Sequence, residues 1–95
     1  MTETKIEIHL NIYMEVVSPK MTNLLDEVDK VGEVVIYIRN MDYTYNRVMD
    51  IINYGTHVKI VEYYRSQIGE VSVERVLHNV KPSAVLRLLF PNSFK

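Results

Sequence analysis

The sequence predicts an α/β two-layer sandwich, in which a four-stranded mixed sheet carries two helices on one face in the chain order β-α-β-α-β-β. Apolar and polar residues alternate strictly over residues 5–17, and two later stretches repeat apolar residues at helical spacing. An almost continuous apolar run, residues 33–39, follows the first of those stretches. The 95 residues are expected to form a single domain, 1–95, without linkers or repeats, in which residues 1–4 are disordered.

The first strand and the first helix are predicted from two different periods. Residues 5–17 place apolar side chains on one face and polar side chains on the other, as in a long half-buried strand. Ser18 is the expected N-cap of the helix, Pro19 occupies its first position, and Gly32 ends it. The apolar stripe of this helix consists of Met21, Leu24, Leu25, Val28 and Val31.

The second strand, the second helix and the third strand follow in the same way. Residues 33–39 are nearly all apolar, which is typical of a central strand covered on both faces. Asp42 is the expected N-cap of a second helix that Gly55 closes. Apolar residues recur in it at i, i+3, i+4 and i+7, namely Tyr45, Val48, Met49 and Ile52. Residues 57–64 then form the third strand. The first strand, the first helix and the second strand are expected to make a right-handed parallel crossover.

The last third of the chain fits two patterns. Val71 and Val73 alternate as in a strand, yet Val73, Val76, Leu77 and Val80 also share one helical face. Residues 83–90 form either a short helix after Pro82 or a fourth strand. The strand is favoured, because the third strand needs a neighbour and the preceding residues are typical of a loop.

Composition excludes several classes of protein. The chain has no cysteine, which excludes disulfide scaffolds, thiolate metal sites and cysteine nucleophiles. No apolar run is long enough for a transmembrane helix, and no signal peptide is recognisable, so a cytoplasmic protein is expected. The net charge is −1, but residues 1–55 carry five basic and nine acidic residues while residues 56–95 carry six and three. This asymmetry is either chance or a basic arm that suits a polyanion.

Neither catalysis nor cofactor binding is predicted. His9, His57 and His78 lack the spacing of a local metal site, so no metal is expected. Asp26, Glu27 and Asp29 are typical of a solvated helix face, and no serine has a histidine–acid pattern beside it. The protein is therefore expected not to be an enzyme and to have no cofactor.

The sheet face opposite the predicted helices is of mixed character. It is expected to carry His9, Asn11, Tyr13, Val35, Tyr37, Arg39, Lys59, Val61 and Tyr63. Such a face is either covered, by a second copy of the chain or by the C-terminal segment, or it is a platform on which unpaired bases stack. An uncovered apolar face on so small a domain predicts a homodimer.

Several segments resemble a known family. Pro19-Lys20 resembles a turn that contacts nucleic acid in the Alba family of small archaeal chromatin and RNA-binding proteins. Residues 33–39, 46–50 and 83–90 resemble its second strand, its second helix and its last strand. Residues 65–81 correspond to its hairpin arm between the third and fourth strands. The layout also resembles the C-terminal domain of translation initiation factor three.

The resemblance implies a non-enzymatic, homodimeric protein that binds DNA or RNA mainly through phosphates. Lys20, Arg39 and Arg47 are the phosphate contacts expected from the body, and Arg65, Arg75 and Lys81 those from the arm. The alternative is a protein–protein interaction module or a small viral or plasmid accessory protein with the same fold. Convergence of the six basic side chains on one surface would favour nucleic-acid binding.

Overall fold

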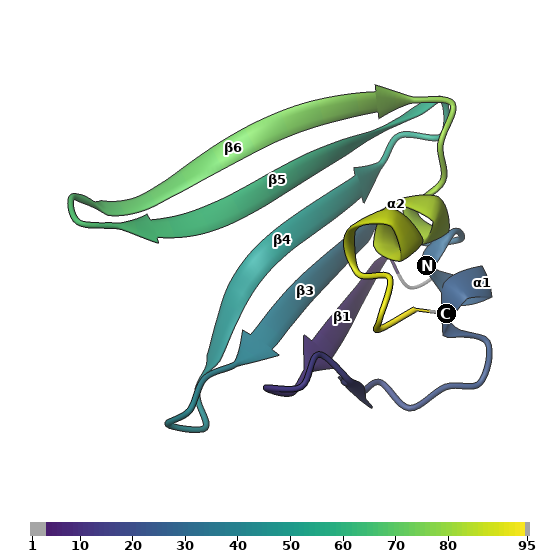
Figure 1. Cartoon of the computed structure of the whole chain (residues 1–95). Helices are drawn as coiled ribbons and strands as arrows, with labels where there is room; N and C mark the ends of the chain where they lie inside the picture. The colour runs from purple at the N-terminus through teal and green to yellow at the C-terminus, as the bar shows by residue number, and fades with distance from the viewer. Residues whose placement is uncertain (1–3, 95) are drawn as a thin grey trace.

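The computed structural model of the chain describes residues 4–94, which form a mixed sheet of six strands with two short helices packed against one of its faces (Figure 1). The sheet order is β2-β1-β3-β4-β5-β6, and within the described residues β1 and β3 are the parallel pair. The predicted four-stranded sandwich is therefore wrong. The elements are β1 (Lys5–Leu10), β2 (Val16–Ser18), α1 (Leu24–Val28), β3 (Glu33–Arg39), β4 (Tyr45–Asn53), β5 (His57–Ser66), β6 (Gly69–His78) and α2 (Pro82–Leu89).

The expected first strand is divided by a turn. The side-chain Oδ1 of Asn11 accepts hydrogen bonds from the backbone N–H groups of Tyr13 and Glu15, at 2.9 and 3.0 Å. Met14 adopts a positive φ of 64°, so the chain reverses and β2 returns antiparallel to β1. Alternation continued through this turn by coincidence, which is why residues 5–17 looked like one strand.

The first helix is much shorter than predicted. It spans Leu24–Val28 rather than residues 19–31, and Leu24, Val28 and Val31 are buried while Leu25 is half-buried. The backbone N–H groups of Gly32 and Glu33 both donate to the carbonyl oxygen of Thr4, at 3.0 Å each. These bonds hold Thr4 beside the start of β3, whereas the expected disorder of residues 1–3 lies outside the described residues.

The predicted second helix is a strand. Ile36 lies opposite Met49 and Tyr37 lies opposite Arg47, so Val48 is an extra residue that forms a β-bulge in β4. A bulge shifts an alternating pattern by one residue, which turned the apolar positions of β4 into a helical spacing. Asp42, the expected N-cap, instead accepts from the backbone N–H of Thr44 in the turn between β3 and β4.

The third strand is confirmed and extends into a hairpin. β5 and β6 pair antiparallel over ten residues each and are joined by Gln67 and Ile68. Pairing of β5 with β4 ends at Glu62 opposite Met49, so the distal parts of β5 and β6 diverge from β4 (Figure 1). We call β5 and β6 beyond this point the arm. The arm consists of residues 63–72, the end of β5 and the start of β6, whereas an arm was expected at residues 65–81.

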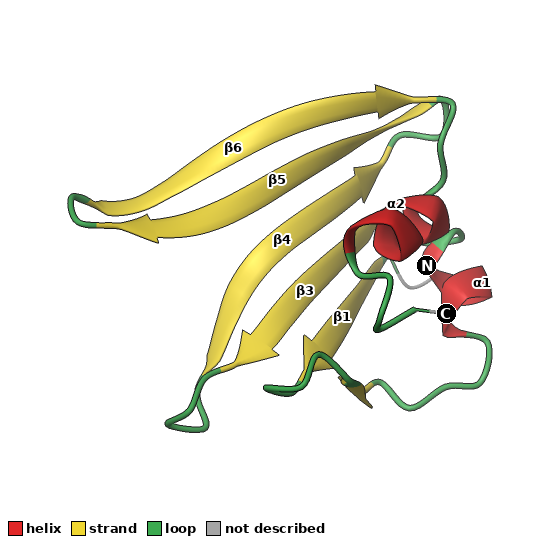
Figure 2. Cartoon of the chain, in the orientation of Figure 1, coloured by secondary structure: helices red, strands yellow, loops and turns green. Residues whose placement is uncertain are grey.

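The favoured fourth strand at residues 83–90 is wrong, because Pro82–Leu89 form α2 (Figure 2). Pro82 stands in the first turn, where its missing N–H costs nothing. The side chain of Asp29 accepts bonds from the backbone N–H and the hydroxyl of Ser83, at 2.9 and 2.7 Å, which joins α2 to the end of α1. β6 supplies the neighbour that β5 required.

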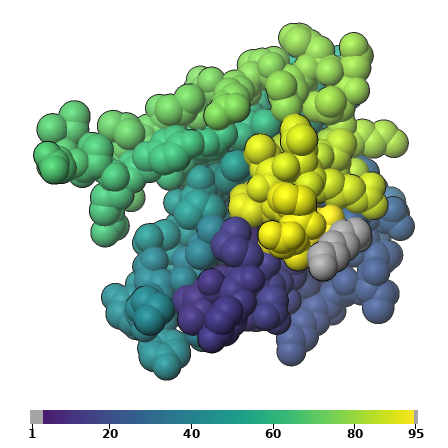
Figure 3. All heavy atoms as spheres, viewed as in Figure 1, coloured from purple at the N-terminus to yellow at the C-terminus, as the bar shows by residue number. Residues whose placement is uncertain are grey.

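The hydrophobic core lies between the helices and one face of the sheet. It contains Ile8, Leu10, Leu24, Val28, Val31, Val34, Ile36, Met49, Ile51, Val58, Ile60, Val85, Leu86 and Phe94. The C-terminal segment lies on this side, next to the N-terminal strands (Figure 3), and the hydroxyl of Ser93 donates to the carbonyl of Met14. The opposite face of the sheet, which we call the open face, carries neither helix.

Candidate functional site

Strand register defines which side chains share the open face. His9, Tyr37 and Arg47 lie opposite one another on three neighbouring strands, as do Glu7, Val35, Asp50 and Val61 on four strands. The expected set on β1, β3 and β5 is therefore correct, namely His9, Val35, Tyr37, Arg39, Lys59, Val61 and Tyr63. Asn11 and Tyr13 lie in the turn after β1, and β4 adds Tyr45, Arg47 and Asp50.

Five residues at one end of the open face form an aromatic patch: His9, Tyr37, Arg39, Tyr43 and Tyr45. The His9 ring stacks on Tyr37 and meets Tyr45 edge-on, with 4.8 Å between ring centroids in both pairs. The guanidinium of Arg39 lies over the Tyr43 ring, 4.9 Å from its centroid. Tyr43 and Tyr45 are 75% and 41% exposed. The patch thus offers accessible rings beside a cation.

The buried side-chain donor of Arg39 has no hydrogen-bond acceptor. This donor is Nε, and within residues 4–94 the guanidinium forms no ion pair. A buried donor without an acceptor costs about 1–3 kcal/mol. A guanidinium is suited to bind a carboxylate or phosphate through two parallel bonds. Among the described residues, the positive charge of Arg39 is thus not neutralised by a carboxylate.

Asp50 organises a second cluster on the open face. Its side chain is buried and accepts bonds from Nε and Nη2 of Arg47, at 2.8 and 2.7 Å, and from the hydroxyl of Tyr63 at 2.6 Å. The bond to Asp50 raises the pKa of Tyr63 and also that of Arg47. Glu33 lies 3.5 Å from Nη2 of Arg47. Two carboxylates therefore occupy Arg47, which leaves it poorly placed to bind a phosphate.

The six predicted phosphate-binding side chains do not converge on one surface. Arg39, Arg47 and Arg65 lie on the open face, and Arg65 forms no ion pair with another described residue. Arg75 lies opposite Ile60 on the helix side of the sheet and is paired with Glu62 at 3.2 Å. Lys20 precedes α1 and Lys81 directly precedes α2. Three of the six thus share the open face, at different positions along it.

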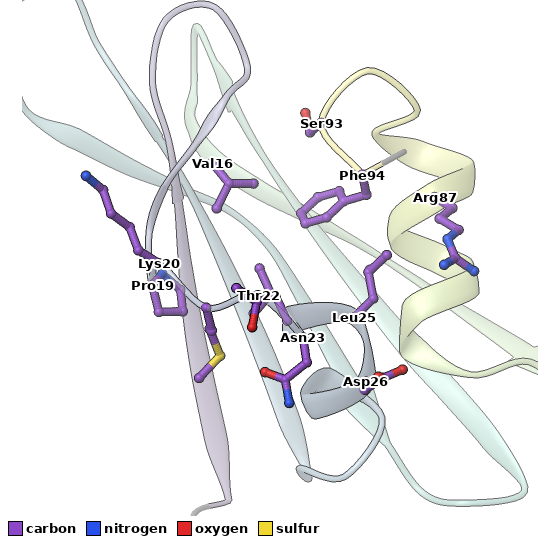
Figure 4. A pocket seen from close by; sticks show the side chains of 12 residues that line it. Val16, Pro19, Lys20, Thr22, Asn23, Leu25, Asp26, Arg87, Ser93 and Phe94 are labelled. Atoms are coloured by element: carbon purple, nitrogen blue, oxygen red, sulfur yellow. The ribbon is translucent and has the colours of Figure 1, made fainter.

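A hollow of about 450 Å³ lies on the helix side, between α1, the residues before it and the C-terminal segment. Leu25 and Phe94 contribute apolar side chains, and Asp26 and Arg87 lie at its margin (Figure 4). Lys20 also lines it, but its ammonium group points away from the centre (Figure 4). The hollow is wide and open, and its charged groups do not point toward a common point.

Sequence reasoning missed the rings of Tyr45, on β4, and of Tyr43, in the turn before β4. Tyr45 was assigned to the apolar stripe of a helix, so neither it nor Tyr43 was considered for the open face. A usable signal exists, because Tyr43, Tyr45 and Arg47 alternate with polar residues at the period of a strand.

Comparison of the chain with protein-family models, curated proteins and solved structures gave no match. Within the described part of the chain, no group of three histidine or acidic side chains is placed to hold a metal ion. Neither helix there has the length and apolar character needed to cross a membrane.

Proposed function

We propose that the chain binds single-stranded nucleic acid on the open face of its sheet, without catalysis. Bases stack on the aromatic patch, and phosphates contact Arg39 and, farther along the arm, Arg65. Sequence-tolerant binding of unpaired strands commonly combines aromatic side chains with cations that follow the backbone. DNA and RNA share both features, so the proposal covers either.

The position of the Arg39 guanidinium is the observation that supports the proposal most directly. This guanidinium lies over the Tyr43 ring, in the patch where the His9 ring contacts Tyr37 and Tyr45. It forms no ion pair with another described residue. A phosphate pairs with the positive charge of this guanidinium at the place where neighbouring bases meet exposed rings. The open face also has nearly balanced charge, since Lys59 and Arg47 are already paired with Glu74 and Asp50. This balance favours binding by base stacking with few phosphate contacts. Binding to duplex DNA would need many more phosphate contacts.

The test is fluorescence anisotropy with labelled oligothymidine and oligouridine of about 15 nucleotides and with a duplex of the same length. We expect single strands to bind more tightly than the duplex. Two phosphate contacts predict a slope of log K against log salt of about −1.4, from about −0.7 per contact on single strands. Loss of a stacked base in Tyr45→Ala weakens binding by about 1–3 kcal/mol.

The matched control for Arg39→Ala is Arg87→Ala, which removes the same charge from α2 on the other side of the sheet. We expect Arg39→Ala to weaken binding and Arg87→Ala to leave it unchanged. Arg39→Ala also removes a buried unpaired donor, so the stability of the fold should not decrease. Equal losses in the two variants, or no binding of any oligonucleotide at low salt by the folded protein, would overturn the proposal.

A further inference from the structure

β6 is a long, uncovered edge strand. It pairs with β5 along ten residues without a register shift. The strand at the other edge of the sheet, β2, is only three residues long. Natural proteins usually protect a long edge with prolines, bulges, charged side chains (lysine above all) or a covering element. β6 contains neither proline nor lysine, and Val71, Val73 and Val76 are 41%, 44% and 51% exposed. The charged side chains of β6 are Glu70, Glu74 and Arg75, so the edge can pair with another strand in a register that keeps like charges apart.

The ladder shows which backbone groups are free. The N–H of Asn79 donates to the carbonyl of Thr56, and this pair continues the register of His57 opposite His78. Because hydrogen-bonded and non-bonded pairs alternate in an antiparallel ladder, odd-numbered residues of β6 bond to β5. Even-numbered residues, such as Ser72, point their N–H and C=O groups outward from the sheet edge.

We propose that β6 pairs antiparallel with β6 of a second copy of the chain, about a two-fold axis that passes at Val73. Side chains that face each other across such a pair must lie on the same side of the sheet. The axis is therefore perpendicular to the sheet and passes at a residue, which limits the possible registers. This inference rests on the edge strand alone and stands apart from the proposed function.

Charge selects among these registers, because like charges directly opposite each other are unfavourable. An axis at Ser72 places Glu70 opposite Glu74, and axes at Glu74 or Arg75 place each of those residues opposite its own copy. An axis at Val73 avoids every such clash and pairs residues 69–77. Axes at Val71 and Val76 also avoid them but pair only residues 69–73 and 74–78 of β6.

The Val73 register also gathers exposed apolar side chains. Val71 and Val73 lie on the helix side of β6, opposite Tyr64 and Glu62, beyond the part of the sheet that the helices cover. In the pair, Val73 meets Val73 of the second copy, and Val71 lies opposite Arg75, whose alkyl chain extends the contact. This self-complementary pattern favours a second copy of the chain over an unrelated strand.

The test uses single cysteines, since the natural chain has none. Val73 is a non-hydrogen-bonded position in the proposed pair, with about 4.5 Å between Cα atoms, which is within the range of a disulfide. On oxidation, Val73→Cys should form a covalent dimer of twice the mass of one chain. Arg75→Cys, on the same side of β6 but far from its own copy, should remain monomeric on non-reducing gels.

A second variant tests the edge without covalent chemistry. Ser72→Pro removes an outward N–H and leaves the ladder with β5 intact, so it should sediment as a monomer while Ser72→Ala sediments with the native protein. A native protein that is monomeric at high concentration would overturn the proposal. Faster cross-linking of Arg75→Cys or Val76→Cys than of Val73→Cys would also overturn it.

Discussion

Replacing Asp50 tests whether its hydrogen bonds stabilise the open face of the sheet. Asp50 is 4% exposed, although the face bears no helix, and its carboxylate accepts three hydrogen bonds between 2.6 and 2.8 Å. Arg47 and Tyr63, which donate them, lie on different strands, so Asp50 joins the two strands beyond the point where their backbones pair. We predict that Asp50→Ala destabilises the fold strongly.

The magnitude follows from the donors that are left behind. Each hydrogen bond to a charged group is worth about 1.5–3 kcal/mol. The side chain of Arg47 is 44% exposed and keeps Glu33 nearby, so water and Glu33 recover part of the loss. We therefore expect Asp50→Ala to lower the free energy of unfolding by about 2–4 kcal/mol. Tyr63→Phe, which removes one donor to the carboxylate, should cost about 1.5–3 kcal/mol.

Urea unfolding, followed by circular dichroism, measures both effects. A domain of this size has about 5–15 kcal/mol of stability, so both variants should still fold. In a double-mutant cycle, the loss of stability in the double variant should be smaller than the sum of the two single losses, because Asp50→Ala already removes the acceptor of Tyr63. A loss below about 0.5 kcal/mol for Asp50→Ala would refute the reasoning.

Two further predictions concern pH and the helix face. The raised pKa of Tyr63 means that its contribution to stability is complete below its ordinary value of 10.0 and is lost as pH rises through the higher folded-state value. Alkaline unfolding curves should thus show a smaller loss of stability above pH 10.0 in Tyr63→Phe than in the native protein. Leu86→Ala, at a fully buried position of α2, should cost about 2–5 kcal/mol in a denaturant titration. Leu88→Ala, at a position 71% exposed, should change stability by less than about 0.5 kcal/mol, and similar losses in both would show that α2 is rotated.

Parts of the fold were predictable from local pattern. The start of β1, all of β3 and most of β5 follow from apolar residues at strand spacing, and the parallel pairing of β1 with β3 follows from the helix between them. The open-face residues on these strands were predictable for the same reason, because register is fixed once alternate positions are buried.

The rest depended on features that single-residue patterns do not reveal. The bulge at Val48 displaced the apolar positions of β4 into helical spacing, and a bulge arises from the pairing with β3 rather than from local sequence. Pro82 fits the start of a helix, but residues 83–90 also alternate as a strand does. That choice was decided by β6, which pairs with β5 and leaves the C-terminal segment free to cover the core.

The two proposals together predict how binding depends on oligonucleotide length. A two-fold axis perpendicular to the sheet places the open faces of both copies on the same side, so one strand can meet two aromatic patches. Linked sites typically raise affinity by about 10²–10⁴-fold when the ligand spans both, and not otherwise. The disulfide-linked Val73→Cys dimer should therefore bind long oligonucleotides much more tightly than Ser72→Pro, while the two should bind short ones equally per site. Equal length dependence in the two variants would mean that the open faces do not act together, even if each proposal holds by itself.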